Sequence, residues 1–65
     1  MFQRKVGNWL IRTGAVESGK VETRITRDGK LALRREWATA SEAMHGHALA
    51  VREVEAMVAL AKVAA

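Results

Sequence analysis

The sequence of 65 residues contains no cysteine, no proline and only three aromatic residues, Phe2, Trp9 and Trp37. Without cysteine the chain can form neither a disulfide nor a thiolate metal site, and two histidines are too few for a structural zinc site. A domain this small buries only roughly 60% of the surface of its unfolded chain. Because other common means of stabilising a small domain are missing, we expect association with another copy.

Long apolar segments are also missing. The most apolar region is interrupted by four charged side chains, Arg52, Glu53, Glu55 and Lys62, so no stretch of about 18 residues could cross a membrane. The N-terminal MFQRKVGNWL lacks the uninterrupted apolar core of a signal peptide. We therefore expect a cytoplasmic protein with no membrane partner. The lack of a proline-rich or low-complexity linker predicts a single domain over residues 1–65.

Acidic residues are scarce in the first half of the chain. Residues 1–37 contain nine Lys or Arg against four Asp or Glu, whereas residues 38–65 contain two against three. The net charge of +4 therefore comes from the first half. Such a positive field favours anionic partners such as nucleic acid, although the same charge also keeps small proteins in solution.

Alternation of apolar and polar residues predicts three β-strands in this basic half. Residues 2–13 are rich in aromatic and branched side chains and precede the polar segment GAVESG, which has the composition of a loop. Residues 20–27 and 30–37 each alternate cleanly along their length. We expect these strands to form an antiparallel meander.

The turn around Asp28 and Gly29 decides which side chains share a face of the sheet. A two-residue turn would pair Ile25 with Ala32 and divide the apolar residues between the two faces. A three-residue loop, Arg27-Asp28-Gly29 with Gly29 in the left-handed conformation, pairs Ile25 with Leu31 instead. We expect this loop because it places one apolar set on one face: Val21, Ile25, Leu31 and Leu33.

Charge pairing on the opposite face favours the same loop. It sets Glu22 opposite Arg34 and Lys20 opposite Glu36, two attractive pairs. The other loop of equal length, Asp28-Gly29-Lys30, would set like charges opposite each other: Arg24 with Arg34, and Glu22 with Glu36. Arg35 then points to the apolar side, and we expect it at the margin of the core, with its head in water or paired with a helix glutamate.

The residues after Thr39 change to a helical pattern. The sequence TASE is typical of a capping box, in which the Thr39 hydroxyl accepts from the Glu42 amide and the Glu42 carboxylate accepts from the Thr39 amide. A helix is predicted over residues 40–64, which are dense in Ala, Leu, Met and Glu. Gly46 inside this helix marks either close packing or a weak first turn.

This helix has two apolar faces. One broad face is expected to cover the sheet: Ala43, His47, Ala50, Val51, Val54, Met57, Val58 and Ala61. The opposite face is expected to form an oligomer interface: Leu49, Ala56, Leu60 and Val63. The predicted fold is therefore α+β, a three-stranded antiparallel β-meander followed by one long C-terminal helix (β-β-β-α), as a homo-oligomer.

Catalytic and cofactor-binding patterns are weak throughout the sequence. The segment GAVESGKV has the glycine and lysine spacing of a phosphate-binding loop, but Val21 replaces the required hydroxyl residue and a strand follows instead of a helix. His45 and His47 project to opposite sides of a helix, so they cannot bind one metal; we expect His45 in solvent and His47 partly buried. No enzyme, cofactor or metal is predicted.

The function expected from these patterns is non-catalytic binding. Six cations are candidates for contacts with nucleic acid across the outer face of the sheet: Lys20, Arg24, Lys30 and Arg34, joined by Arg4 and Arg12 if Trp9 and Ile11 point inward. Trp9 and Trp37 are expected in the core, so stacking on bases has little support. The alternative is a small protein-interaction module, an inhibitor or adaptor of the kind that mobile elements encode, which docks on a larger protein by its apolar helix or by a sheet edge.

Overall fold

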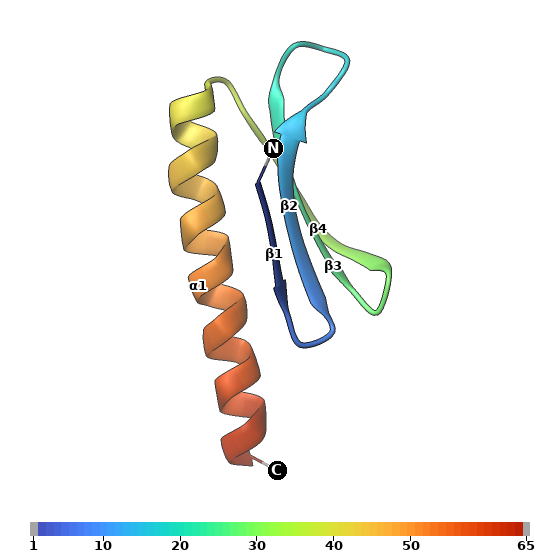
Figure 1. The fold of residues 1–65 in the computed structure, drawn as a ribbon, viewed down its shortest axis with the longest axis vertical. Helices are drawn as coiled ribbons and strands as arrows, with labels where there is room; N and C mark the ends of the chain where they lie inside the picture. The colour runs from blue at the N-terminus through green and yellow to red at the C-terminus, as the bar shows by residue number, and fades with distance from the viewer. Residues whose placement is uncertain (1, 65) are drawn as a thin grey trace.

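The computed structural model describes residues 2–64, which form an antiparallel sheet covered on one face by a single helix (Figure 1). Five elements follow one another along the chain: β1 (Phe2–Val6), β2 (Trp9–Ala15), β3 (Val21–Arg27), β4 (Lys30–Trp37) and α1 (Ala40–Ala64). The strands lie in the order β1-β2-β3-β4, so each strand pairs with the one that precedes it. The predicted α+β class, a sheet followed by one C-terminal helix, is confirmed.

The number of strands differs from the prediction, because residues 2–13 do not form one strand. The chain reverses at Gly7 and Asn8, where Gly7 has a φ of 59° and Val6 pairs with Trp9. Glycine adopts this left-handed conformation without steric cost and is preferred at the first position of a type II′ hairpin turn. The expected three-stranded sheet is therefore wrong, and four strands are present.

The turn between β3 and β4 also differs from the expected three-residue loop. Asp28 and Gly29 both have positive φ, 53° and 78°, and Arg27 pairs directly with Lys30. Two consecutive positive φ values are the signature of a two-residue type I′ turn. This turn has the right-handed twist of the flanking strands, which is why it is preferred in hairpins.

A bulge in β4 then changes which face the next residues occupy. Thr26 pairs with Leu31 but Ile25 pairs with Leu33, so Ala32 is the additional residue of the bulge. Ile25 and Leu33 thereby share the helix-facing side, as expected. Leu31 does not join them, because its partner Thr26 belongs to the outer face.

The bulge also replaces the expected charge pairs across β3 and β4. Glu22 lies opposite Glu36, and Arg24 lies opposite Arg34. The predicted register, with Glu22 opposite Arg34 and Lys20 opposite Glu36, is therefore wrong, although the Glu22 carboxylate still reaches Arg34 Nε diagonally at 3.6 Å. Like charges face each other across these two strands, which is the register that charge pairing alone disfavours.

Helix α1 has the predicted bounds, and its first turn is capped by Thr39. The Glu42 amide donates to Thr39 Oγ1 at 3.2 Å, as in a capping box. The Glu42 carboxylate accepts from the Thr39 hydroxyl, also at 3.2 Å, instead of from the Thr39 amide. No helix within residues 2–64 has the length and apolar character needed to cross a membrane.

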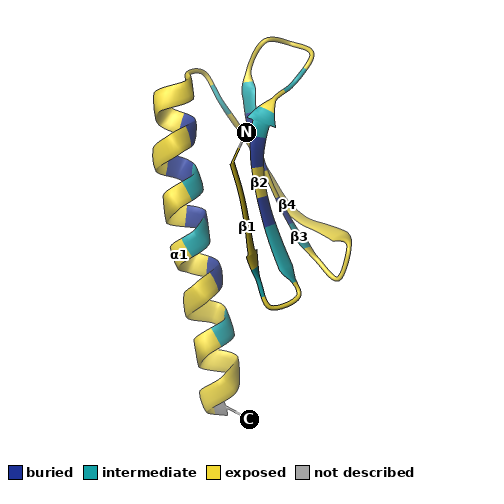
Figure 2. Cartoon of the chain, viewed as in Figure 1, coloured by how far each residue is buried: buried dark blue, intermediate teal, exposed yellow. Residues whose placement is uncertain are grey.

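The core lies between the sheet and the N-terminal part of α1 (Figure 2). Its buried apolar side chains are Ile11, Ile25, Ala43, Ala50 and Val54. The C-terminal part of α1 projects beyond the sheet (Figure 1), and Met57 and Ala61 are exposed there. Those two residues were expected to cover the sheet, but the strands are too short to reach them.

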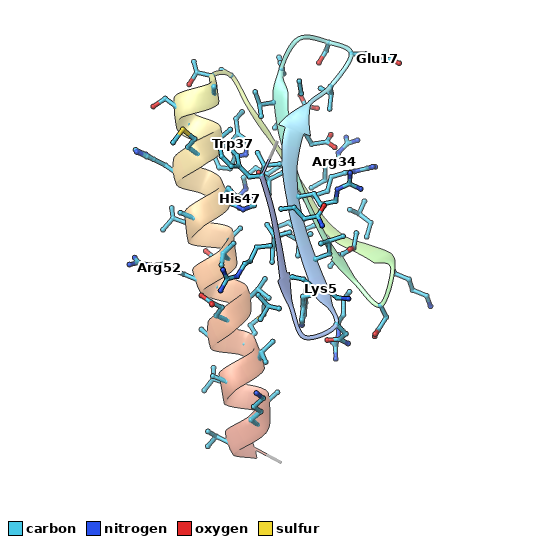
Figure 3. The ribbon with its side chains drawn as sticks, in the orientation of Figure 1. Lys5, Glu17, Arg34, Trp37, His47 and Arg52 are labelled. Atoms are coloured by element: carbon cyan, nitrogen blue, oxygen red, sulfur yellow. The ribbon has the colours of Figure 1, made fainter. Side chains whose placement is uncertain are left out.

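Trp37 and Gly46 account for the close approach of α1 to the end of β4. The Trp37 ring lies so near the helix that a Cβ on Gly46 would collide with it (Figure 3). Of the two explanations for this glycine, close packing is the correct one. Both tryptophans are half-buried on the helix-facing side of the sheet, at the margin of the core.

Candidate nucleic-acid interface

The outer face of the sheet, which points away from α1, carries three arginines side by side. Arg12 on β2 pairs with Arg24 on β3, and Arg24 pairs with Arg34 on β4. Side chains opposite each other in an antiparallel sheet are only about 5 Å apart at Cβ. We call these three residues the arginine row; Arg34 is seen on the side of the sheet opposite the helix in Figure 3.

Glu22 lies beside the arginine row and forms ion pairs with two of its residues, Arg24 and Arg34. It is buried, and its carboxylate lies 3.1 Å from Arg24 Nε and 3.6 Å from Arg34 Nε. Both guanidinium groups nevertheless remain well exposed. Within residues 2–64, Arg12 takes part in no ion pair, so its charge is available to an incoming anion.

A shallow hollow adjoins the arginine row where Gly14 lies on the outer face without a side chain. Gln3, Arg12, Glu22 and Arg24 are among the residues that line it. The described part of the outer face has no aromatic side chain, since all three aromatic residues have helix-facing strand neighbours. Within the described residues, the outer face therefore presents cations and no aromatic ring for stacking.

Three of the six predicted cations lie outside this surface. Arg4 pairs with the buried Ile11 and so faces the helix, where its guanidinium is 3.6 Å from the Glu55 carboxylate. Lys30 pairs with Arg27, at the turn and on the helix-facing side. Lys20 lies in the loop between β2 and β3. Arg12, Arg24 and Arg34 are the predicted residues that the sheet brings together.

Lys5 belongs to the outer face and is not among the predicted residues. It pairs with Leu10, which neighbours Arg12 on β2 by the alternation of the strand. The turn at Gly7 and Asn8 reverses the chain, so odd-numbered residues of β1 share a face with even-numbered residues of β2. The signal was in the sequence, because Gly-Asn between two apolar runs is typical of a two-residue hairpin turn.

The remaining exposed arginines of the sheet pack on tryptophan rings. The Arg27 guanidinium lies 5.4 Å from the Trp9 ring centre, and that of Arg35 lies 5.8 Å from the Trp37 ring centre. Such cation–π contacts contribute about 0.5–1 kcal/mol at exposed sites. These cations lie on the helix-facing side and are separate from the arginine row.

Trp37 and His47 lie in the space between sheet and helix (Figure 3), and a chain of hydrogen bonds joins them. Trp37 Nε1 donates to Thr23 Oγ1 at 2.9 Å, the two threonine hydroxyls of Thr23 and Thr13 are 2.7 Å apart, and Thr13 Oγ1 is 2.8 Å from His47 Nδ1. Each hydroxyl has one proton, so every group is satisfied when His47 Nδ1 is the acceptor. Burial lowers the pKa of His47 from 6.5, which favours this neutral form.

The predicted oligomer residues are all on the surface of this single chain. Leu49, Ala56, Leu60 and Val63 are exposed along one side of α1. His45 is exposed and His47 is half-buried with a hydrogen bond to Thr13, both as predicted. The part of the chain described has no group of three or more His, Asp or Glu residues that could hold a metal ion.

Comparison with known proteins finds no family model, no curated protein sequence and no solved structure that matches this chain.

Proposed function

We propose that this protein is a non-catalytic nucleic-acid-binding module that contacts phosphates with the outer face of its sheet. The arginine row is the observation that carries the proposal. Each pair of like charges placed directly opposite in a sheet is unfavourable by roughly 0.2–1 kcal/mol. An anionic ligand relieves this repulsion, and a polyanion with regularly spaced phosphates can contact several members of the row together.

The chemistry of the surface indicates binding without sequence preference. Arginine side chains contact phosphates from either strand of any sequence, whereas base readout needs groups placed in a groove or stacked on bases. The outer face offers cations, the amide of Gln3 and the apolar side chains of Leu10 and Leu31. Non-specific affinities supplied by such contacts are typically about 10⁻⁶ to 10⁻⁴ M at physiological salt.

Fluorescence anisotropy with labelled duplex and single-stranded DNA and RNA tests the proposal directly. Three phosphate contacts predict that log K falls with log salt concentration with a slope of about −3 for duplex DNA and about −2 for single strands. Arg12→Gln should weaken binding and reduce the slope by about 1.

Arg52→Gln is the matched control, because it removes the same charge from a side chain that points away from the sheet (Figure 3). This variant should bind as the wild type does. If no nucleic acid binds at low salt, or if both variants lose the same affinity, the arginine row is not the binding surface. Binding to a cellular protein that survives high salt would favour the alternative, a protein-interaction module.

A further inference from the structure

More large apolar side chains are exposed in this chain than are buried. Among residues 2–63, the core has only Ile11, Ile25 and Val54 besides two alanines. Eight large apolar residues of the same range are exposed: Phe2, Leu31, Leu33, Met44, Leu49, Met57, Leu60 and Val63. A compact monomer of 7.1 kDa exposes about 4,100 Å², whereas this chain exposes 4861 Å². The surplus, roughly 750 Å², is close to the ~800 Å² that one partner buries in a standard protein interface.

Much of this surface lies on the side of α1 next to β4. Leu33, Trp37 and Leu49 line a groove between the strand and the helix. The same side of α1 continues through residues at helical spacing from Leu49. We call this surface the docking patch: Leu33, Trp37, Leu49, Ala56, Leu60 and Val63. No other segment of residues 2–64 covers it.

The charges within the groove are self-complementary. Arg35 and Glu53 both line it, and neither forms an ion pair with another residue in the described part of the chain. In a two-fold symmetric interface the same surface meets itself, so a patch with one cation and one anion can satisfy both. Arg35 can then pair with Glu53 of the partner subunit.

The open edge of β4 is a less suitable contact. Natural sheet edges avoid pairing with other chains by bulges and charged side chains. This edge has the bulge at Ala32 and two cations, Lys30 and Arg34. Contact through the docking patch leaves that protected edge free.

We propose that two copies of this chain associate through the docking patch as a two-fold symmetric dimer, with Arg35 of each copy against Glu53 of the partner subunit. Such contact removes the exposed apolar residues next to β4 from water. It leaves the outer face of both sheets uncovered, so this association and the proposed nucleic-acid binding can be tested separately.

Sedimentation equilibrium over a range of protein concentrations tests the dimer. The wild type should have a mass of about 14 kDa, twice the 7.1 kDa of one chain. Leu49→Glu should weaken association at least about tenfold, because it places an unpaired carboxylate in the apolar contact. Met44→Glu is the matched control: Met44 and Leu49 are both 57% exposed on α1, but only Leu49 lines the groove.

A charge exchange tests the same contact without altering its apolar residues. Arg35→Glu alone and Glu53→Arg alone should each weaken the dimer by about tenfold or more, since like charges then meet. An equimolar mixture of these two variants should form a heterodimer as tight as the wild type, because both pairs are then attractive. Circular dichroism shows whether each variant keeps its helix.

Three results would overturn the dimer. The first is a wild-type mass of about 7 kDa at all concentrations up to about 1 mM. This result would overturn the dimer even if the docking patch bound a different protein. The second is that Met44→Glu and Leu49→Glu weaken the association of the two copies equally while both variants remain folded. The third is a mixture of the two charge variants that associates no better than either variant alone.

Discussion

At the scale of single residues, the hydrogen-bonded chain from Trp37 to His47 is the most constrained part of the molecule. It joins three strands, β2, β3 and β4, to the helix by polar groups in a space that also contains the apolar core. Buried polar groups cost free energy unless each has a partner. The network therefore favours one arrangement of protons, with the Thr13 hydroxyl donating to a neutral His47.

Stability should fall in mildly acidic solution because of His47. The pKa of His47 is lowered by burial, so between pH 6.5 and that lowered pKa the unfolded chain binds a proton more readily than the folded chain. The contribution of neutral His47 to the free energy of unfolding is present above pH 6.5. It is lost as the pH falls toward the pKa of His47 in the folded protein. Urea unfolding at pH 7.5 and 5.5 should show the loss.

Matched histidine variants separate this effect from general acid destabilisation. His47→Gln should remove most of the difference in the free energy of unfolding between pH 7.5 and pH 5.5. Glutamine can still accept a hydrogen bond from Thr13 but does not titrate. His45→Gln changes the exposed histidine of the same helix turn and should leave the difference intact. An unchanged difference in His47→Gln would contradict the role given to this side chain.

At the scale of the elements, Gly46 is where the Trp37 ring packs directly against the backbone of α1. Glycine usually lowers helix stability by about 1 kcal/mol relative to alanine. Here it makes room for the Trp37 ring at the end of β4. The unfavourable helix propensity is offset by ring packing and by the hydrogen bond from Trp37 to Thr23.

Gly46→Ala should therefore destabilise the protein, although alanine is the better helix former. Displacing the ring is expected to cost about 1–3 kcal/mol, as overpacking does elsewhere. In a Trp37→Leu background, Gly46→Ala should instead stabilise by up to about 1 kcal/mol. Urea unfolding of the wild type, the two single variants and the double variant measures the effect of Gly46→Ala with and without the Trp37 ring. Ala48→Gly, at an exposed position of α1, calibrates the helix propensity, and a stabilising Gly46→Ala in the wild type would contradict the ring contact.

At the scale of the whole molecule, cations and exposed apolar side chains occupy different surfaces. The arginine row lies on the outer face of the sheet, and the docking patch runs from the groove between β4 and α1 along the exposed side of α1. Glu22 offsets the repulsion between Arg24 and Arg34, but the repulsion between Arg12 and Arg24 opposes folding of the free protein. A surface that reduces stability in isolation is consistent with a binding function, since stability and function often conflict.

Arg12→Thr should stabilise the free protein while it weakens binding to nucleic acid. Removing the repulsion with Arg24 should raise the free energy of unfolding by roughly 0.2–1 kcal/mol, and threonine is well suited to a strand. The gain should shrink at high salt, because salt screens exposed charges. Arg52→Gln should show no such salt-dependent gain in the same urea titrations, and a destabilised Arg12→Thr would argue against repulsion in the row.

Local patterns in the sequence determined much of the fold. The capping residue and the helical spacing of apolar residues predicted α1 with its observed bounds. Clean alternation likewise predicted the segments that became β3 and β4. These features depend on interactions within a few residues, so a single sequence is enough to identify them. The hairpin at Gly7 and Asn8 was equally local, but the continuous apolar pattern around it concealed it.

Only the tertiary structure decided which side chains meet across the sheet. A shift of one residue moves every side chain to the other face, and the bulge at Ala32 makes that shift partway along a strand. The arginine row, with its unfavourable like-charge pairs, could not be predicted because charge pairing favours the opposite register. The burial of Ile25 against α1 outweighs surface charge, since burial contributes more free energy than exposed ion pairs.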